Sequence, residues 1–196
     1  AKASGAIREG ATILVLTDRA MDSANAPIPS LLAASAVHHH LLRDGLRGRV
    51  SLIVESGEPR DVHHFATLIS YGANAINPYL ALATADSMAD KELSPARAMR
   101  NYLHAAEHGL FKIMAKMGIT TVDSYCGAQI FEAIGISNTI IAQHFEGTPS
   151  HVGGLELDDI AKIVLSWHEK TSGSGLESHG FYKFKRDGEL HAFSPE

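Results

Sequence analysis

The chain has 196 residues, 45% of them hydrophobic, which is enough for one domain with a substantial core. Its formal net charge is -5, and it has neither the clustered basic face that nucleic acid requires nor the apolar run of roughly 18 residues that a membrane span needs. The single cysteine excludes an internal disulfide, and residues 1–10 lack the apolar core of a secretory signal, so we expect a soluble protein of a reducing compartment, cytosolic or organellar.

Three short apolar runs in the first half of the chain predict strands, at residues 11–16, 50–56 and 73–79. The first run is continuously apolar, which is typical of a strand buried on both faces. Between the runs we expect two helices, one beginning at Ser30 and one beginning after Asp61 as its N-cap. Strand–helix–strand spacing of about 25–35 residues is that of β/α units with parallel strands.

The strand–helix–strand spacing is not continued after residues 81–94, a polar stretch of uncertain structure. A long helix is expected from Pro95 onward, and Gly109 is a point where it could break. A fourth strand is expected at residues 119–126. The remaining expected elements are short helices at 127–135 and 138–145, a loop at 147–154, an amphipathic helix at 155–170, a flexible connector at 171–180 and a hairpin around Asp187 and Gly188.

Together these elements predict an α/β fold, with repeated β/α units that form a partial barrel or a small, mainly parallel sheet flanked by helices. The sequence pattern does not choose between those two arrangements. We expect one β/α domain over residues 1–170, followed by a linker and a hairpin-like tail over residues 171–196.

Polar side chains stand at the carboxyl end of each expected strand, where parallel α/β sheets gather their ligands. These residues are Asp18 and Arg19, Glu55 and Ser56, Asn77 and Tyr79, and Ser124 and Tyr125. They could line a pocket or a channel. Equally, they could satisfy loop backbone groups or pair with one another, Arg19 with Glu55.

Histidine is abundant, with twelve residues that include the runs His38-His39-His40 and His63-His64. Neutral imidazole is a common ligand of zinc and other transition metals. Consecutive helical residues point about 100° apart, however, so one metal could not take all three of the first run. Because paired Cys/His spacing is also absent, capping and helix–sheet packing are the better interpretation of these side chains.

Two other chemistries find little support. Cys126 stands between an expected strand and helix, where its pKa could be lowered, but no motif supplies a partner base, so a small buried residue is the default interpretation. No glycine-rich phosphate-binding motif occurs.

Several segments, taken in order, resemble the large (alpha) chain of glutamate synthase over roughly residues 6–165. The most specific are VHHFATLISYGANAINPYLA and MGITTVDSYCGAQIFEAIG, and they are joined by IPSLLAASAVHHHLLRDGLR and FEGTPSHVGGLELDDIA. The tail FYKFKRDGELHAFSPE is also similar to the adjoining segment of that family. The resemblance is to the second half of the central domain and the approach to the FMN domain.

The resemblance implies a parent enzyme that transfers the amide nitrogen of glutamine to 2-oxoglutarate and so makes two glutamates. In that family a glutaminase domain with an N-terminal cysteine nucleophile precedes the central domain, and an FMN barrel with an iron–sulfur cluster comes after it. The central domain is an α/β fold related to a partial barrel; it joins the two active sites and helps to form the ammonia tunnel between them. The compartment implied is the cytoplasm or the plastid stroma.

No catalytic or cofactor residue of the family can be placed on this sequence, which starts at Ala1 and has no cysteine series for a cluster. We therefore expect a connecting, channel-forming segment without its own catalytic, cofactor-binding or metal-binding residues, inactive when isolated. Its partners would be the glutaminase and FMN domains, and the small subunit or ferredoxin of the parent, with no nucleic acid and no membrane. The candidates for channel or interface positions are Ser56, His63, His64, Asn77, Tyr79, Tyr125 and Gln129.

Two alternatives remain open at the level of sequence. One is a free-standing small β/α enzyme or ligand-binding domain, with a strand-end pocket built on Glu55, His63 and Tyr125. The other is a metal site that includes His38 or His63. A segment that normally packs against other domains should also expose an apolar patch, so we expect self-association as a dimer.

Overall fold

The structure is a computed structural model that describes residues 2–91 and 93–170. The expected tail over residues 171–196 lies outside the described residues. None of the described helices is both long and apolar enough to cross a membrane.

The first sheet has three parallel strands in the order β1-β2-β3. They are β1 (Ile13–Thr17), β2 (Ser51–Glu55) and β3 (Ala75–Asn77). Helix α2 (Ser30–Arg43) joins the first two strands, and α3 (Val62–Ser70) joins the last two. The expectation of parallel β/α units is confirmed for this part of the chain, and the described sheets do not close into a barrel.

Local sequence explains where these helices begin and end. Helix α3 starts after Asp61, which forms a capping box with His64, as the sequence predicted for its N-cap. Helix α2 ends at Arg43, and Gly45 comes next but one at φ +66°, a left-handed conformation that glycine adopts without strain.

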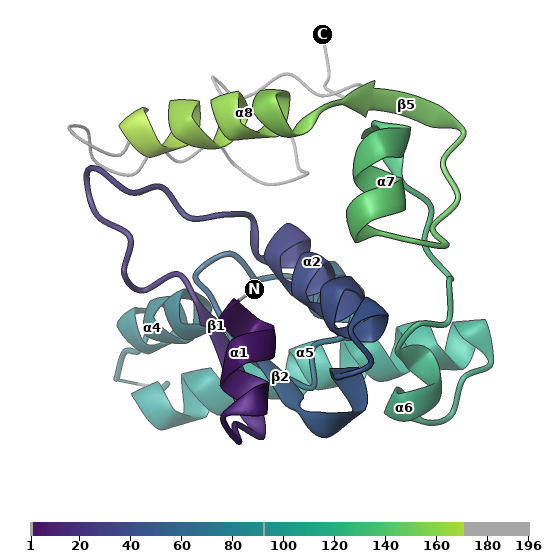
Figure 1. The fold of residues 1–196 in the computed structure, drawn as a ribbon. Coiled ribbons are helices and arrows are strands. Elements are labelled where there is room, and N and C mark those ends of the chain that lie inside the picture. Colours follow the sequence, from purple (N-terminus) through teal and green to yellow (C-terminus); the bar gives the residue numbers. More distant parts are fainter. Residues whose placement is uncertain (1, 92, 171–196) are drawn as a thin grey trace, which may run out of the picture.

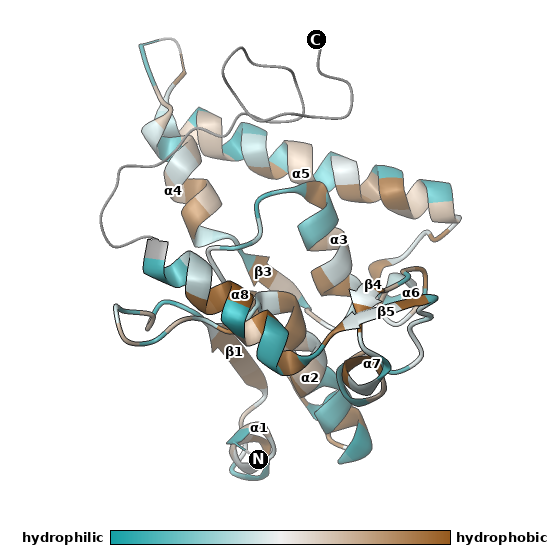
Figure 2. Ribbon diagram, turned by 90° about the horizontal axis from the view of Figure 1, so that it is seen from above, coloured by the Kyte–Doolittle hydropathy of each residue, from teal (hydrophilic) through white to brown (hydrophobic). Residues whose placement is uncertain are grey.

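The described residues cover only one face of the three-stranded sheet. Leu16 and Val54 pack in a core cluster with Ala34 of α2 and Leu68 of α3. The opposite face carries Ile13 and Val15, whose exposed fractions are 56% and 53%. The expectation that β1 is buried on both faces is therefore wrong for the described chain, because helices cover the sheet from one side only. Figure 2 shows β1 as a hydrophobic strand at the edge of the sheet.

Helix α4 (Tyr79–Ser87) and the long helix α5 (Pro95–Met117) come after the sheet and pack against each other. Helix α5 does not break at Gly109. A β-carbon added there would stand 2.4 Å from Cγ2 of Val62, so the missing side chain lets α5 lie directly on α3.

The expected fourth strand at residues 119–126 is wrong. The structure instead has the short helix α6 (Val122–Tyr125), with Thr121 as N-cap accepting a hydrogen bond from the Ser124 backbone N–H. Tyr125 is fully buried against Ala66 and Met114. A capping threonine and the packing of one aromatic ring on α3 and α5 outweigh the β-branched composition of this stretch.

Two further expectations are wrong in the next segment. Residues 127–135 do not form a helix: Gly127 and Gln129 have positive φ, and β4 (Ile134–Ile136) ends the stretch. The expected loop at 147–154 contains most of β5 (Val152–Leu155), which pairs in parallel with β4. A β-carbon at Gly154 would stand 2.5 Å from the Gly135 carbonyl oxygen, so glycine, usually a strand breaker, is required by this close pairing.

Helices α7 (Asn138–His144) and α8 (Leu157–Lys170) complete the described fold, beside the N-terminal helix α1 (Lys2–Arg8) and a 3-10 turn at Arg47–Arg49. Helix α7 packs on α2. In Figure 1, α8 runs above the segment that joins β1 to α2. The chain thus forms two small parallel sheets flanked by helices, a mixed α/β arrangement.

Candidate functional site

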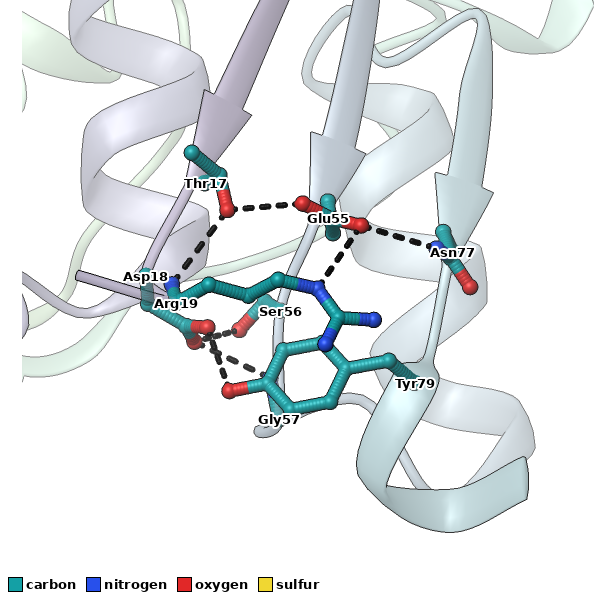
Figure 3. A network of polar contacts seen from close by, with 8 residues as sticks. All are labelled: Thr17, Asp18, Arg19, Glu55, Ser56, Gly57, Asn77 and Tyr79. Atoms are coloured by element: carbon teal, nitrogen blue, oxygen red, sulfur yellow. Dashed lines mark hydrogen bonds and ion pairs between the residues drawn. The ribbon is translucent and has the colours of Figure 1, made fainter. Parts of the chain in front are cut away.

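The carboxyl ends of β1, β2 and β3 meet in one polar network (Figure 3). Thr17, Glu55 and Asn77 are neighbours in register across the three strands. Because side chains alternate along a strand, Thr17 falls on the same uncovered face as Ile13 and Val15. We call this network the strand-end cluster, and its members are Thr17, Asp18, Arg19, Glu55, Ser56, Gly57, Asn77 and Tyr79.

The Glu55 carboxylate accepts hydrogen bonds on both oxygens. The Thr17 hydroxyl donates to Oε2 at 2.8 Å, and the Asn77 amide donates to Oε1 at 3.1 Å. The Arg19 guanidinium also pairs with Oε1, with Nε at 2.9 Å. The hydrogen bond from Thr17 and then the Arg19 guanidinium hold the pKa of Glu55 below its ordinary value. The pairing of Arg19 with Glu55 that the sequence suggested is confirmed.

The Asp18 carboxylate is held in the same way. The Ser56 hydroxyl donates to Oδ2 at 2.6 Å, and the Gly57 backbone N–H donates to the same oxygen at 3.0 Å. The Tyr79 hydroxyl donates to Oδ1 at 2.8 Å. Burial and then this hydrogen bond raise the pKa of Tyr79 to about 12.

Arg19 links the two carboxylate systems. Its guanidinium carbon lies 4.1 Å above the centre of the Tyr79 ring, within range of a cation–π interaction, while its Nε faces Glu55. A cavity of about 550 Å³ adjoins this edge of the sheet, lined among others by Thr17, Glu55 and Ser56. This side of the cavity therefore carries two carboxylates that are held by the chain: Glu55 is paired with Arg19, and Asp18 is held by uncharged hydrogen-bond donors.

The seven candidate positions divide among several places. Ser56, Asn77 and Tyr79 lie in the strand-end cluster. His63 and His64 lie in the first turn of α3, where the ring of His63 packs edge-on against Phe131 and His64 belongs to the capping box. Burial, and then the charge of Arg60, lower the pKa of His64.

Tyr125 and Gln129 lie elsewhere. Tyr125 is buried on α6, and its hydroxyl has no hydrogen-bond partner among the described residues. Gln129 lines a second cavity of about 560 Å³, together with His38, Tyr71 and Thr148. The Gly127 backbone N–H of this segment donates to the Ser70 carbonyl at the end of α3, so Gln129 stands near the opposite end of α3 from His63.

The network also contains residues that sequence reasoning did not single out. Thr17 and Gly57 were missed, although Thr17 ends the first apolar run directly before Asp18. The in-register pairing of Thr17 with Glu55 becomes visible only when the strands are aligned.

A second cluster has the composition of a catalytic triad but not its geometry. The Ser4 hydroxyl lies 2.8 Å from Nε2 of His40 and donates to Asp44 at 2.6 Å, while Asp44 lies 3.4 Å from the same Nε2. In a triad the acid holds the other ring nitrogen and the serine gives its proton to the histidine. Here Ser4 is buried and its proton goes to Asp44, so the cluster ties α1 to α2.

The described part of the chain contains neither a metal site nor an activated thiol. No group of three histidine, cysteine or acidic side chains is arranged there to hold a metal ion. Burial raises the pKa of the Cys126 thiol, which is the opposite of what an activated nucleophile needs.

The fold and the cluster define an α/β scaffold of parallel β/α units whose strand-end carboxylates are held by hydrogen bonds and one ion pair within the chain. A flavocytochrome b2 mutant with pyruvate bound has a similar fold, with a TM-score of 0.50 and 13% identity over 79% of this chain and 39% of the other. At that identity the likeness is one of fold alone.

Sequence comparison identifies the family. Residues 1–137 match the family described as glutamate synthase central domain, and the chain belongs to it. Among similar proteins, the glutamate synthase [NADPH] large chain of Bacillus subtilis (strain 168) is 47% identical over the whole of this chain and 13% of its own length. Ferredoxin-dependent glutamate synthase 2 of Synechocystis sp. is 44% identical over 97% of the chain and 14% of its own length. The glutamate synthase [NADH] of Saccharomyces cerevisiae is 39% identical over 98% and 10%. The chain thus spans about a seventh or less of each of these relatives.

Proposed function

We propose that this chain is a connecting segment of a glutamate synthase and supplies no catalytic residue of its own. The parent would form two glutamates from glutamine and 2-oxoglutarate by reductive amidotransfer, with FMN and an iron–sulfur cluster bound elsewhere. Membership of the central-domain family and relatives named as glutamate synthases support this proposal. The partners would be the glutaminase and FMN domains, and the small subunit or ferredoxin, in the cytoplasm or the plastid stroma.

The observation that carries the proposal is that both oxygens of each strand-end carboxylate accept hydrogen bonds from the chain itself. A general base needs a lone pair within reach of the proton it abstracts and a pKa near the working pH. Glu55 and Asp18 each receive donors on both oxygens, and the pKa of Glu55 is lowered. These carboxylates order the sheet edge and are unsuited to acid–base chemistry.

We further propose that the strand-end cavity contributes to the passage of ammonia between the two active sites of the parent. Its wall carries the hydroxyls of Thr17 and Ser56, and the two carboxylates there, Asp18 and Glu55, already accept hydrogen bonds from the chain. Uncharged ammonia would therefore meet hydrogen-bonding groups along this wall. Ser56 would act at this wall, and Asn77 and Tyr79 would act through Glu55 and Asp18, to which they donate hydrogen bonds. His63, His64, Tyr125 and Gln129 would act at interfaces with the neighbouring domains.

The scaffold proposal is tested on the purified 196-residue chain. We expect no hydrolysis of glutamine and no change with Cys126→Ala. Glutamine hydrolysis that Cys126→Ala abolishes would show that the segment carries its own nucleophile, and the proposal would then be wrong.

The passage proposal is tested in the full-length enzyme that contains this segment. Ala33 lines the strand-end cavity, so Ala33→Met should narrow it and raise the glutamine hydrolysed per glutamate formed, with free ammonia appearing in solution. Ala36 lies further along α2 and does not line that cavity, so Ala36→Met is the matched control. An unchanged ratio in Ala33→Met would contradict the passage and leave the scaffold role intact.

A further inference from the structure

An apolar groove of about 350 Å³ lies between α8 and the segment that leads into α2. Ile28 and Leu32 form part of one wall, and Leu157, Ile160 and Val164 form part of the other. The α8 residues are three and four positions apart, so they make one continuous stripe along the helix. All the side chains that line the groove are hydrocarbon, whereas sites for small metabolites also carry a few placed polar groups.

The described residues do not fill this groove. Ile28 is 67% exposed and Leu165 is 50% exposed, although both line it. Trp167 lies further along the same helix and is 65% exposed. Large apolar side chains gathered at one exposed site indicate a surface that another segment covers.

We propose that residues 181–186 of this same chain, FYKFKR, occupy the groove, with the aromatic rings of Phe181 and Phe184 against its hydrocarbon walls. This interaction goes beyond the connecting role proposed above and does not depend on it.

The length of the intervening chain supports this occupant. Helix α8 has 14 residues and is therefore about 21 Å long. The connector over residues 171–180 is rich in glycine and serine, and a flexible linker of that length has an end-to-end distance of about 18 Å. Phe181 can therefore return along α8 to its N-terminal end, and the tether favours this segment over any occupant that arrives from solution.

Charge complementarity supports the same occupant. Glu156 and Asp158 flank Leu157 at the start of α8, and neither makes an ion pair within the described chain. The segment carries Lys183, Lys185 and Arg186 between and after its aromatic residues. Bound from the acidic end of α8, it would place cations beside carboxylates and rings beside the apolar stripe.

Trp167 is the only tryptophan of the sequence and lies three residues beyond Val164 on the same helix, so its fluorescence reports on a segment that lies along α8 without further labelling. In the full chain we expect Trp167 to be protected from acrylamide quenching, independently of protein concentration. Phe181→Ser combined with Phe184→Ser should raise the quenching constant about twofold as the indole becomes exposed. Lys183→Glu combined with Lys185→Glu should raise it as well.

The matched control is Phe193→Ser, an aromatic residue of the same tail outside the proposed segment, which should leave quenching unchanged. Because the substituted residues lie outside the described fold, thermal unfolding of each variant separates loss of docking from loss of folding. An indole that is equally accessible in the parent chain and in the Phe181 and Phe184 variant overturns the proposal. Protection that appears only at high protein concentration also overturns it, because a second copy would then be the occupant.

Discussion

The Tyr79 hydroxyl donates a 2.8 Å hydrogen bond to Oδ1 of Asp18, so the first residue of α4 is tied to the end of β1. Since β1 and β3 are the two edge strands, this bond closes the polar network across the whole sheet. Removing it with Tyr79→Phe should lower the free energy of unfolding by about 1 kcal/mol at neutral pH, because Asp18 loses one donor and keeps Ser56 and Gly57. Chemical denaturation at pH 7 measures the difference.

The same residue predicts a loss of stability at alkaline pH. The pKa of Tyr79 is raised to about 12 in the folded protein, against an ordinary value of 10.0. The unfolded chain therefore loses this proton first, and the contribution is complete below pH 10 and lost between pH 10 and about 12. The phenylalanine variant should lose less stability than the parent over that interval. Equal slopes of stability against pH in the two proteins would contradict the assignment.

His38 predicts a loss of stability at acid pH. Burial, and then the charge of Arg47, lower the pKa of His38 from 6.5 to about 4. The unfolded chain therefore binds this proton first, so the contribution is complete above pH 6.5 and disappears as pH falls towards about 4. His38→Asn, which keeps an acceptor for the Arg47 Nε–H, should flatten the fall of the unfolding midpoint between pH 6.5 and pH 4. A fall of the same steepness in the variant would show that another group titrates.

The contact of Gly109 with Val62 predicts an unusual effect of a glycine-to-alanine change. Inside an exposed helix this change stabilises a protein by up to about 1 kcal/mol. At Gly109 the new β-carbon would stand 2.4 Å from Val62, so Gly109→Ala should lower the melting temperature by forcing α5 away from α3. Gly5 of α1 has open space at the same position, so Gly5→Ala is the control and should raise or preserve the melting temperature.

We expect the isolated chain to self-associate through the uncovered face of the sheet. Val15 is 53% exposed there, and Val15→Lys should shift sedimentation of the isolated chain towards the monomer. Leu42 of α2 is equally exposed, at 53%, and Leu42→Lys is the matched control for added charge. A parent chain that sediments as a monomer at high concentration would remove the basis for this prediction.

Sequence predicted the first half of the fold well and the second half poorly, for physical reasons. The segments over β1, α2, β2, α3 and β3 have continuous apolar runs and clear caps, so local propensity and tertiary packing agree. Between Ile119 and Gly154 the two conflict. Thr121 caps a helix in a β-branched stretch, and Gly154 lies in a strand because only glycine fits against the Gly135 carbonyl.

The candidate site was likewise predicted where the strands were predicted correctly and missed elsewhere. Residues at the ends of confirmed strands or directly after them, such as Asp18, Glu55 and Ser56, were placed at this edge of the sheet by their position alone. Tyr125 was assigned to a strand end because its strand was expected, and it is instead a buried packing residue on α6. The pairing of Arg19 with Glu55 was predicted, whereas other partners, such as Tyr79 for Asp18, had no signal in a single sequence.

Because helices cover the sheet on one side only, substitutions on its two faces should have different effects on the isolated chain. A polar substitution at Leu52 or Val54, on the side of α2 and α3, should unfold the isolated chain, since both residues are fully or almost fully buried. The same substitution at Ile13 or Val15 costs the isolated chain little, because water already reaches those side chains. Variants on that second face would therefore fold normally as isolated chains. They would still lose any packing of the exposed sheet face against another layer of structure.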